Sequence, residues 1–151
     1  MSIALVRAHP HLKACILEFK FVCDAAKKII RKERLSHRIK TVAGDMNKSI
    51  PRGFDVIMFW NVGYIRTQGI KMAYDNLSEG GMIVRYCFPP PKSEVPSPSA
   101  FISGYLSVRP KQQSKPGIIS SLKEVGFRSV KYRRISQNIG LTTGFRGKTG
   151  K

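Results

Sequence analysis

The sequence is poor in acidic residues, in cysteine and in long apolar runs. It holds 9 Asp and Glu side chains against 27 Lys and Arg in 151 residues, which gives a formal net charge of +18. No run approaches the roughly 18 consecutive apolar residues that a membrane span needs. The N-terminal residues also lack the basic start, apolar stretch and small-residue cleavage site of a secretory signal. These absences predict a cytoplasmic protein that does not partner a membrane.

Cysteine and histidine are too scarce for a disulfide framework or a metal site. The three cysteines, Cys15, Cys23 and Cys87, are odd in number and widely spaced. No Cys-x-x-Cys pair occurs, and the three histidines do not complete a ligand pattern. We therefore expect reduced thiols packed as small apolar side chains, and no metal ion.

Apolar side chains are nevertheless sufficient for a folded core. Hydrophobic residues make up 42% of the chain, and a chain of this length buries about 68–70% of its unfolded surface. The prediction is one domain spanning residues 1–151. The excess of bases leaves two interpretations open, an anionic partner such as nucleic acid or a solvated basic face. It is most marked in the C-terminal third, where Glu124 is the sole acid after Val95.

The order of the segments predicts alternating strands and helices. Short apolar runs typical of buried strands occur at 14–19, 39–43, 54–60 and 82–88. Apolar side chains repeat at helical spacing over 21–35, 67–77 and 116–125. Residues 100–108 are expected to form a short helix, and residues 128–135 and 140–145 an antiparallel hairpin. Such alternation predicts an α/β fold whose mostly parallel sheet is covered by helices on both faces.

Polar side chains occur where three of the predicted strands end. Glu18 ends the first strand, Asp45 and Met46 follow the second, and Asn61 follows the third. Ligands of open parallel sheets bind beyond the carboxyl ends of the strands. A carboxylate at Glu18 could accept two hydrogen bonds from a ribose diol, and Asp45 could accept from an exocyclic amine while Met46 packs on an adenine face. The alternative for Asp45, which follows a glycine, is an ordinary turn residue.

The colinear set of motifs resembles the catalytic domain of class I S-adenosylmethionine-dependent methyltransferases, in the O-methyltransferase branch. The resemblance covers most of the chain, although no single motif is specific by itself. The matching segments are 2–10, 14–18, 42–46, 54–62, 77–84 and 122–127.

The resemblance implies a Rossmann-like fold and S-adenosyl-L-methionine as the cofactor. It assigns Glu18, Asp45, Met46 and Asn61 to the adenosine half of that cofactor, and Tyr64 and Arg66 to the substrate side. The implied activity is O-methylation of a small hydroxylated molecule. Two kinds of protein partner stay open, a second copy of the chain or an N-terminal partner segment.

Two features of that family are missing from this sequence. Its first strand and the glycine-rich loop that follows have no counterpart, so the chain is expected to begin inside the next helix and to be N-terminally truncated. The loop lets the backbone approach the methionine half of the cofactor. This chain is therefore expected to show weak or no catalysis by itself.

The second missing feature is the histidine that takes the proton from the substrate hydroxyl. Tyr64 stands at its position. A tyrosine, with an ordinary pKa of about 10, is a poor general base near neutral pH. Packing or surface exposure is the simpler interpretation of Tyr64. Methyl transfer itself needs little beyond an in-line approach, so methylation is not excluded.

Two further functions stay open. The first is a basic module that binds RNA or another polyanion on the same fold, with contacts at Lys131, Arg133, Arg134 and Arg146. The second is a non-catalytic remnant whose unpaired strand edges aggregate or recruit a partner. Salt dependence separates the first from adenosine recognition, because phosphate contacts weaken steeply as salt rises.

Overall fold

The computed structural model describes residues 1–60, 62, 64–87, 115–136 and 139–147. They group into two compact units, Met1–Ile50 and Pro51–Lys151. A single domain over residues 1–151 stays a prediction.

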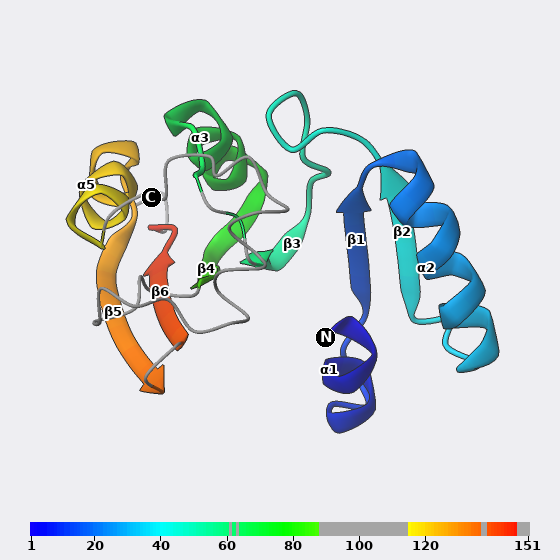
Figure 1. The fold of residues 1–151 in the computed structure, drawn as a ribbon. Helices are drawn as coiled ribbons and strands as arrows, with labels where there is room; N and C mark the ends of the chain where they lie inside the picture. The colour runs from blue at the N-terminus through cyan, green and yellow to red at the C-terminus, as the bar shows by residue number, and fades with distance from the viewer. Residues whose placement is uncertain (61, 63, 88–114, 137–138, 148–151) are drawn as a thin grey trace, which may run out of the picture. The chain divides into compact units, whose positions relative to one another are not determined.

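The first unit is a parallel pair of strands with two helices (Figure 1). Its elements in chain order are α1 (Ser2–Ala8), β1 (Ala14–Glu18), α2 (Lys20–Lys32) and β2 (Ile39–Ala43). The two strands pair in parallel register from Ala14 opposite Ile39 to Glu18 opposite Ala43. Parallel strands need a crossover connection, and α2 supplies it.

Apolar side chains from every part of this unit form its core. Val6 of α1, Ile30 of α2, Leu35 and Ile39 are all buried together. Because α2 is amphipathic, it turns Ile30 inward while its basic side chains stay in solvent. Burial of each such aliphatic side chain contributes roughly 1.5–3 kcal/mol, so these contacts hold the two helices to the strands.

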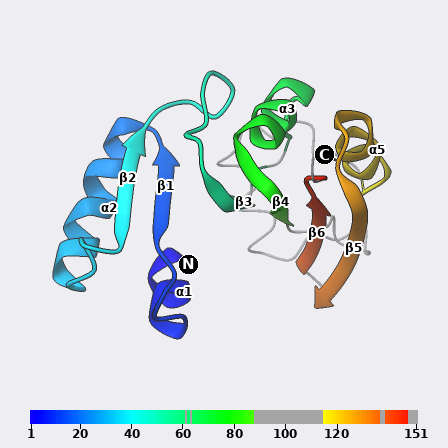
Figure 2. The ribbon, with the colours of Figure 1, turned by 180° about the vertical axis from the view of Figure 1, so that it is seen from behind.

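The second unit contains a four-stranded mixed sheet (Figures 1 and 2). Its elements are β3 (Phe54–Trp60), α3 (Thr67–Asn76), β4 (Leu77–Cys87), α5 (Lys115–Val125), β5 (Arg128–Ser136) and β6 (Ile139–Phe145). The strand order is β3-β4-β6-β5. β3 and β4 are parallel, whereas β6 is antiparallel to both β4 and β5. The predicted α/β class, with parallel units followed by a C-terminal hairpin, is confirmed.

Two helices cover the core of the second unit. Ile70 of α3, Ile118 and Leu122 of α5 and Ile83 of β4 are all buried. The helices lie side by side (Figure 2). Phe127 follows α5 and is also buried. Its ring and the ring of Tyr74 on α3 pack in a T-shaped arrangement. The sheet and its helices therefore share one continuous apolar layer.

The start of β4 differs from the prediction by five residues, whereas the other strand ends differ by one residue at most. The sequence predicts a strand over 82–88 after a break at the paired glycines, but β4 begins at Leu77 and runs through them. Gly80 has a φ of 73°, and a Cβ on Gly81 would lie 2.7 Å from the carbonyl oxygen of Ser78. The pair therefore forms an irregularity within the strand, where the register with β3 also shifts.

The helix predicted over 100–108 lies outside the described residues. Within the part of the chain that the structure describes, no helix has the length and apolar character needed to span a membrane.

Candidate functional site

The carboxyl ends of β1 and β2 form the site in the first unit. Glu18 pairs with Ala43 in the parallel register. The backbone N–H of Gly44 then donates to the carbonyl oxygen of Glu18 at 2.9 Å. This bond holds the turn after β2 against the end of β1. The turn carries Asp45 and Met46, so three of the predicted site residues lie at one end of one sheet.

A buried thiol supports the same end of the sheet. Cys23, in the first turns of α2, lies with its Sγ 3.3 Å from the carbonyl oxygen of Val42 and 3.5 Å from that of Glu18. The thiol donates weakly to either oxygen. It packs the start of α2 onto both strand ends, so the position of the Glu18 backbone is set from two directions.

The side chain of Glu18 is exposed at this end. Its Oε2 accepts a long hydrogen bond, 3.4 Å, from the backbone N–H of Phe19. An ionised carboxylate offers about four acceptor positions. Acceptor positions beyond that bond remain on the carboxylate, and hydrogen bonds from a ribose diol to Glu18 stay a prediction.

Asp45 also organises its own turn. Its Oδ1 accepts from the backbone N–H of Asn47 at 2.8 Å and from the Asn47 side-chain amide at 3.1 Å. Its carbonyl oxygen accepts from the backbone N–H groups of Lys48 and Ser49. Asp45 therefore acts as a turn residue, and a contact of its carboxylate with a ligand stays a prediction.

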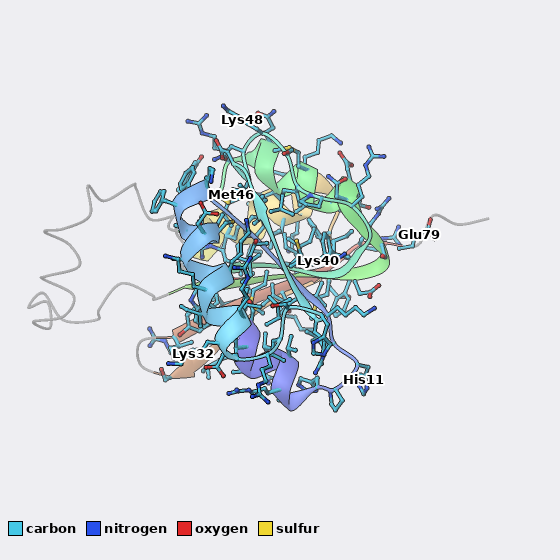
Figure 3. All side chains as sticks on the ribbon, turned by 90° about the vertical axis from the view of Figure 1, so that its right-hand side faces the viewer. His11, Lys32, Lys40, Met46, Lys48 and Glu79 are labelled. Carbon is cyan, nitrogen blue, oxygen red and sulfur yellow. The ribbon has the colours of Figure 1, made fainter. Side chains whose placement is uncertain are left out.

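Apolar and aromatic surface accompanies these carboxylates. Met46 is half-buried and lies at the opposite end of the first unit from His11 and Lys32 (Figure 3). The rings of Phe19 and Phe21 stack with centroids 6.3 Å apart, and both are exposed. The sequence analysis missed this pair, although two phenylalanines directly after a strand-ending acid are a visible signal. Such surface next to a carboxylate suits a flat heteroaromatic ring.

The remaining predicted residues belong to the second unit, beyond the end of β3. Asn61 lies outside the described residues. Tyr64 is 49% exposed and Arg66 is exposed, while Ile65 between them is buried. The buried isoleucine anchors the segment, so its two neighbours are presented outward just before α3.

Three side chains at the ends of β3 and β4 were not predicted. The rings of Trp60 and Tyr86 stack at 3.8 Å with an interplanar angle of 7°. Arg85 is buried, and its Nη2 lies 3.4 Å from the carbonyl oxygen of Val62, to which it donates. A buried guanidinium thus holds the segment that leads to Tyr64. The sequence shows Trp60 as the end of an apolar run, but only the pairing of β3 with β4 shows its partner.

The basic residues proposed for a polyanion divide into two groups. Lys131, Arg133 and Arg134 are exposed along β5. Arg146 is instead engaged within the fold, because its Nη1 donates to the carbonyl oxygens of Asp75 and Leu77 at the end of α3. Within the described ranges, no group of three or more His, Cys, Asp or Glu side chains is placed to hold a metal ion.

Comparison with known proteins shows which proteins this chain resembles. No family model matches the chain. The chain is 31% identical over 148 residues to L-tyrosine C(3)-methyltransferase of Streptomyces lavendulae. This match covers 89% of this chain and 40% of that protein. Among solved structures, the S-adenosylmethionine-dependent methyltransferase SibL is 25% identical with a TM-score of 0.76, covering 97% of this chain and 47% of SibL. An O-methyltransferase family protein from Burkholderia thailandensis is 22% identical with a TM-score of 0.78, over 98% of this chain and 48% of that one.

These likenesses identify the fold class of the chain. The chain has the fold of the class I S-adenosylmethionine-dependent methyltransferases. Within that class it resembles the O-methyltransferase branch, as the sequence motifs predict. It spans about half the length, or less, of the proteins that it matches.

Proposed function

We propose that the chain binds S-adenosyl-L-methionine at the carboxyl ends of β1 and β2 and takes part in methyl transfer to a small hydroxylated molecule. The observation that carries this proposal is the Gly44–Glu18 backbone hydrogen bond, 2.9 Å long. It gathers an exposed carboxylate, a second acid in a tight turn and a half-buried methionine at one end of one sheet. The likeness to SibL and to the tyrosine methyltransferase supports the choice of ligand.

The residues present suit the adenosine half of this cofactor. Glu18 would accept hydrogen bonds from the ribose hydroxyls, and Asp45 would accept from the adenine amine. Met46 and Phe19 offer apolar surface for the adenine ring. When bound, the cofactor supplies an electrophilic methyl group. The chain's own contribution is to orient the adenosyl part, so that the methyl group is held in one place for an in-line approach.

We place the methyl acceptor next to the segment that follows β3. Tyr64 and Arg66 are exposed there and could contact a hydroxylated substrate, Arg66 through its permanent positive charge. The relative from Streptomyces lavendulae is named for methylation of tyrosine at C(3). A small phenol is therefore the first acceptor class to test, with methylation on oxygen as the expected outcome and on ring carbon as the alternative. The expected cytoplasmic location stays a prediction.

Polyanion binding is the weaker candidate. Of its four proposed contacts, Arg146 is engaged with backbone carbonyls and with the ring of Tyr74. The other three are exposed bases on one strand, which suffices for a solvated basic face. The one aromatic side chain of β5, Tyr132, is partly buried with its ring against Gly140, which leaves less of a platform of the kind that single-stranded nucleic acids stack on.

Calorimetric titration of the purified chain with S-adenosylhomocysteine tests the proposal. Recognition by hydrogen bonds and apolar contacts predicts saturable binding that is similar at low salt and at about 0.3 M salt, where phosphate contacts would weaken steeply. Glu18→Ala removes the ribose acceptor and is expected to weaken binding at least tenfold, the equivalent of about 1.4 kcal/mol.

Asp24→Ala is the matched control, because it removes the same charge from an exposed acid in the same unit. Asp24 pairs with Lys20 and Lys27 on α2 and has no role in the proposed binding of the ligand. Unchanged binding in Glu18→Ala, or equal losses in both variants, would contradict the site. Absence of binding by the folded wild-type chain would contradict the proposed function itself.

A further inference from the structure

We propose that an open groove between α2 and β2 binds the phosphate groups of a small phosphorylated ligand. The proposal rests on the first unit alone and does not depend on the proposed cofactor site. Four features of the groove carry it: the residues that line it, its uncompensated charge, its fixed framework and its size.

The lining of the groove supplies hydrogen-bond donors and no acid. Lys27 and Arg31 line it from α2, and Lys40 and Thr41 line it from β2. Ser36, in the connection between these two elements, completes the polar lining. Figure 3 shows this side of the unit, with Lys40 labelled. Three cations and two hydroxyl groups thus border one space, and such donors suit the oxygens of a phosphate group.

The charge of this groove is poorly compensated by the protein. Among the described residues, neither Arg31 nor Lys40 has an ion-pair partner. Lys27 shares Asp24 with Lys20, whose Nζ lies closer to the carboxylate, at 2.8 Å against 3.4 Å. One carboxylate therefore serves two lysines, and the groove keeps most of its positive charge. A cleft lined by charges of one sign attracts and concentrates ions of the opposite sign.

The alternative interpretation of Arg31 is a favourable interaction with its own helix. Arg31 lies in the last turn of α2, where the helix dipole stabilises a cation. That interaction does not account for Lys40, which belongs to the strand, or for the two hydroxyl groups that line the same groove. A common anionic ligand accounts for all of them.

The framework of the groove is fixed by the core and by a tight turn. Its two apolar lining residues, Ile30 and Ile39, belong to the core and are 4% and 3% exposed. In the connection that carries Ser36, the carbonyl oxygen of Leu35 accepts from the backbone N–H groups of Arg38 and Ile39, at 3.0 and 2.9 Å. A preorganised framework loses little entropy on binding, and apolar walls strengthen the attraction of the charges.

The size of the groove favours a small ligand with linked phosphates. Its volume is about 340 Å³, at the lower end of the range for small-molecule sites. One phosphate leaves much of this space unfilled, whereas two or three linked phosphates match the three cations. A nucleic-acid backbone is instead followed by a longer track of cations together with stacking platforms.

Calorimetric titration of the whole chain with inorganic tripolyphosphate at low salt tests the inference. The groove variant combines Arg31→Gln with Lys40→Gln, which removes the two cations that lack an ion-pair partner. The matched control combines Lys28→Gln with Lys32→Gln, an equal loss of charge at exposed positions of the same helix that do not line the groove. The affinity should fall at least about tenfold in the groove variant and less than about threefold in the control.

Two further measurements separate this groove from other sites. In ¹H–¹⁵N correlation spectra, tripolyphosphate should shift backbone amides of residues 27–41 and leave those of residues 128–134 on β5 in place. The groove variant should bind S-adenosylhomocysteine like the wild type, because Ile39 begins β2 whereas Ala43, the partner of Glu18, ends it. The phosphate site and the cofactor site can therefore fail independently of each other.

Three results would overturn the proposal. The first is the absence of saturable tripolyphosphate binding by the folded wild-type chain. The second is an equal loss of affinity in the groove variant and its control, which would show attraction by net charge alone. The third is tighter binding of a uridylate oligonucleotide than of tripolyphosphate, weakened in the groove variant only, which would assign the groove to a nucleic-acid backbone instead of a small ligand.

Discussion

The guanidinium of Arg146 lies over the ring of Tyr74, with its Cζ 5.4 Å from the ring centroid. From there Nη1 donates to the carbonyl oxygens of Asp75, at 3.2 Å, and Leu77. The last carbonyls of a helix lack partners within the helix. A residue directly after the last strand therefore completes the end of α3, about 70 positions earlier in the chain.

Arg146→Met should lower the free energy of unfolding by about 1–3 kcal/mol, because it leaves carbonyl groups without a charged donor and removes the cation–π contact. Arg133→Met is the control. It makes the same change at an exposed position on β5 and should stay within about 0.5 kcal/mol of the wild type. Urea denaturation followed by circular dichroism measures both. Equal effects would show that the loss comes from lowering the charge rather than from the contact.

Two substitutions of Asp45 are expected to distinguish its effect on the stability of the turn from its effect on ligand binding. Asp45→Ala removes the acceptor of the Asn47 N–H and should cost about 1 kcal/mol of unfolding free energy. Asp45→Asn keeps a side-chain carbonyl for the turn and should cost less than that. Both should weaken binding of S-adenosylhomocysteine, measured by calorimetry, because both remove the carboxylate proposed to face the adenine amine. Full affinity in Asp45→Asn would limit Asp45 to a structural role in the turn.

The stacked pair at the ends of β3 and β4 should contribute to stability and to fluorescence. Tyr86→Leu removes a ring that lies 3.8 Å from Trp60. The expected loss is about 0.5–1.5 kcal/mol beyond the change in buried area, together with an altered emission spectrum of the single tryptophan. Tyr64→Leu, at an exposed position beyond β3, should leave the emission spectrum and the stability unchanged. An altered spectrum in Tyr64→Leu alone would contradict the assignment of the stacked partner.

Cys15 is expected to alkylate slowly. Burial raises the pKa of its thiol above the ordinary value, the neighbouring Cys23 raises it further, and Lys40 opposes both. A raised pKa means less thiolate at a given pH, and the thiolate is the reacting form. The rate of modification by iodoacetamide, read by mass spectrometry, should therefore rise at higher pH in the folded chain than in urea. If the rate of modification rose at the same pH in the folded chain as in urea, or at a lower pH, this prediction would be contradicted.

Local patterns predicted most of the secondary structure. The runs at 39–43 and 54–60 match β2 and β3 at both ends, because a short apolar run bounded by turn residues is a local property. The start of β4 was wrong by five residues. There the paired glycines, which usually interrupt a strand, sit in an irregularity of the ladder instead.

The candidate site was predictable where it depends on strand ends. Glu18 and Asp45 each follow an apolar run, so their places at the carboxyl end of the sheet follow from parallel pairing. The sequence left open whether Asp45 is a turn residue or contacts a ligand, since an aspartate after a glycine suits both roles. The phenylalanine pair beside Glu18 was missed because its stacking depends on the first turn of α2.

The sequence by itself determined the order of strands and helices, the positive charge and the resemblance to a methyltransferase, because each depends on residue types and spacings along the chain. The tertiary structure decided which distant residues meet. Trp60 stacks on Tyr86, and Arg146 reaches Leu77, because strand register sets these distances and register depends on contacts between segments far apart in the chain.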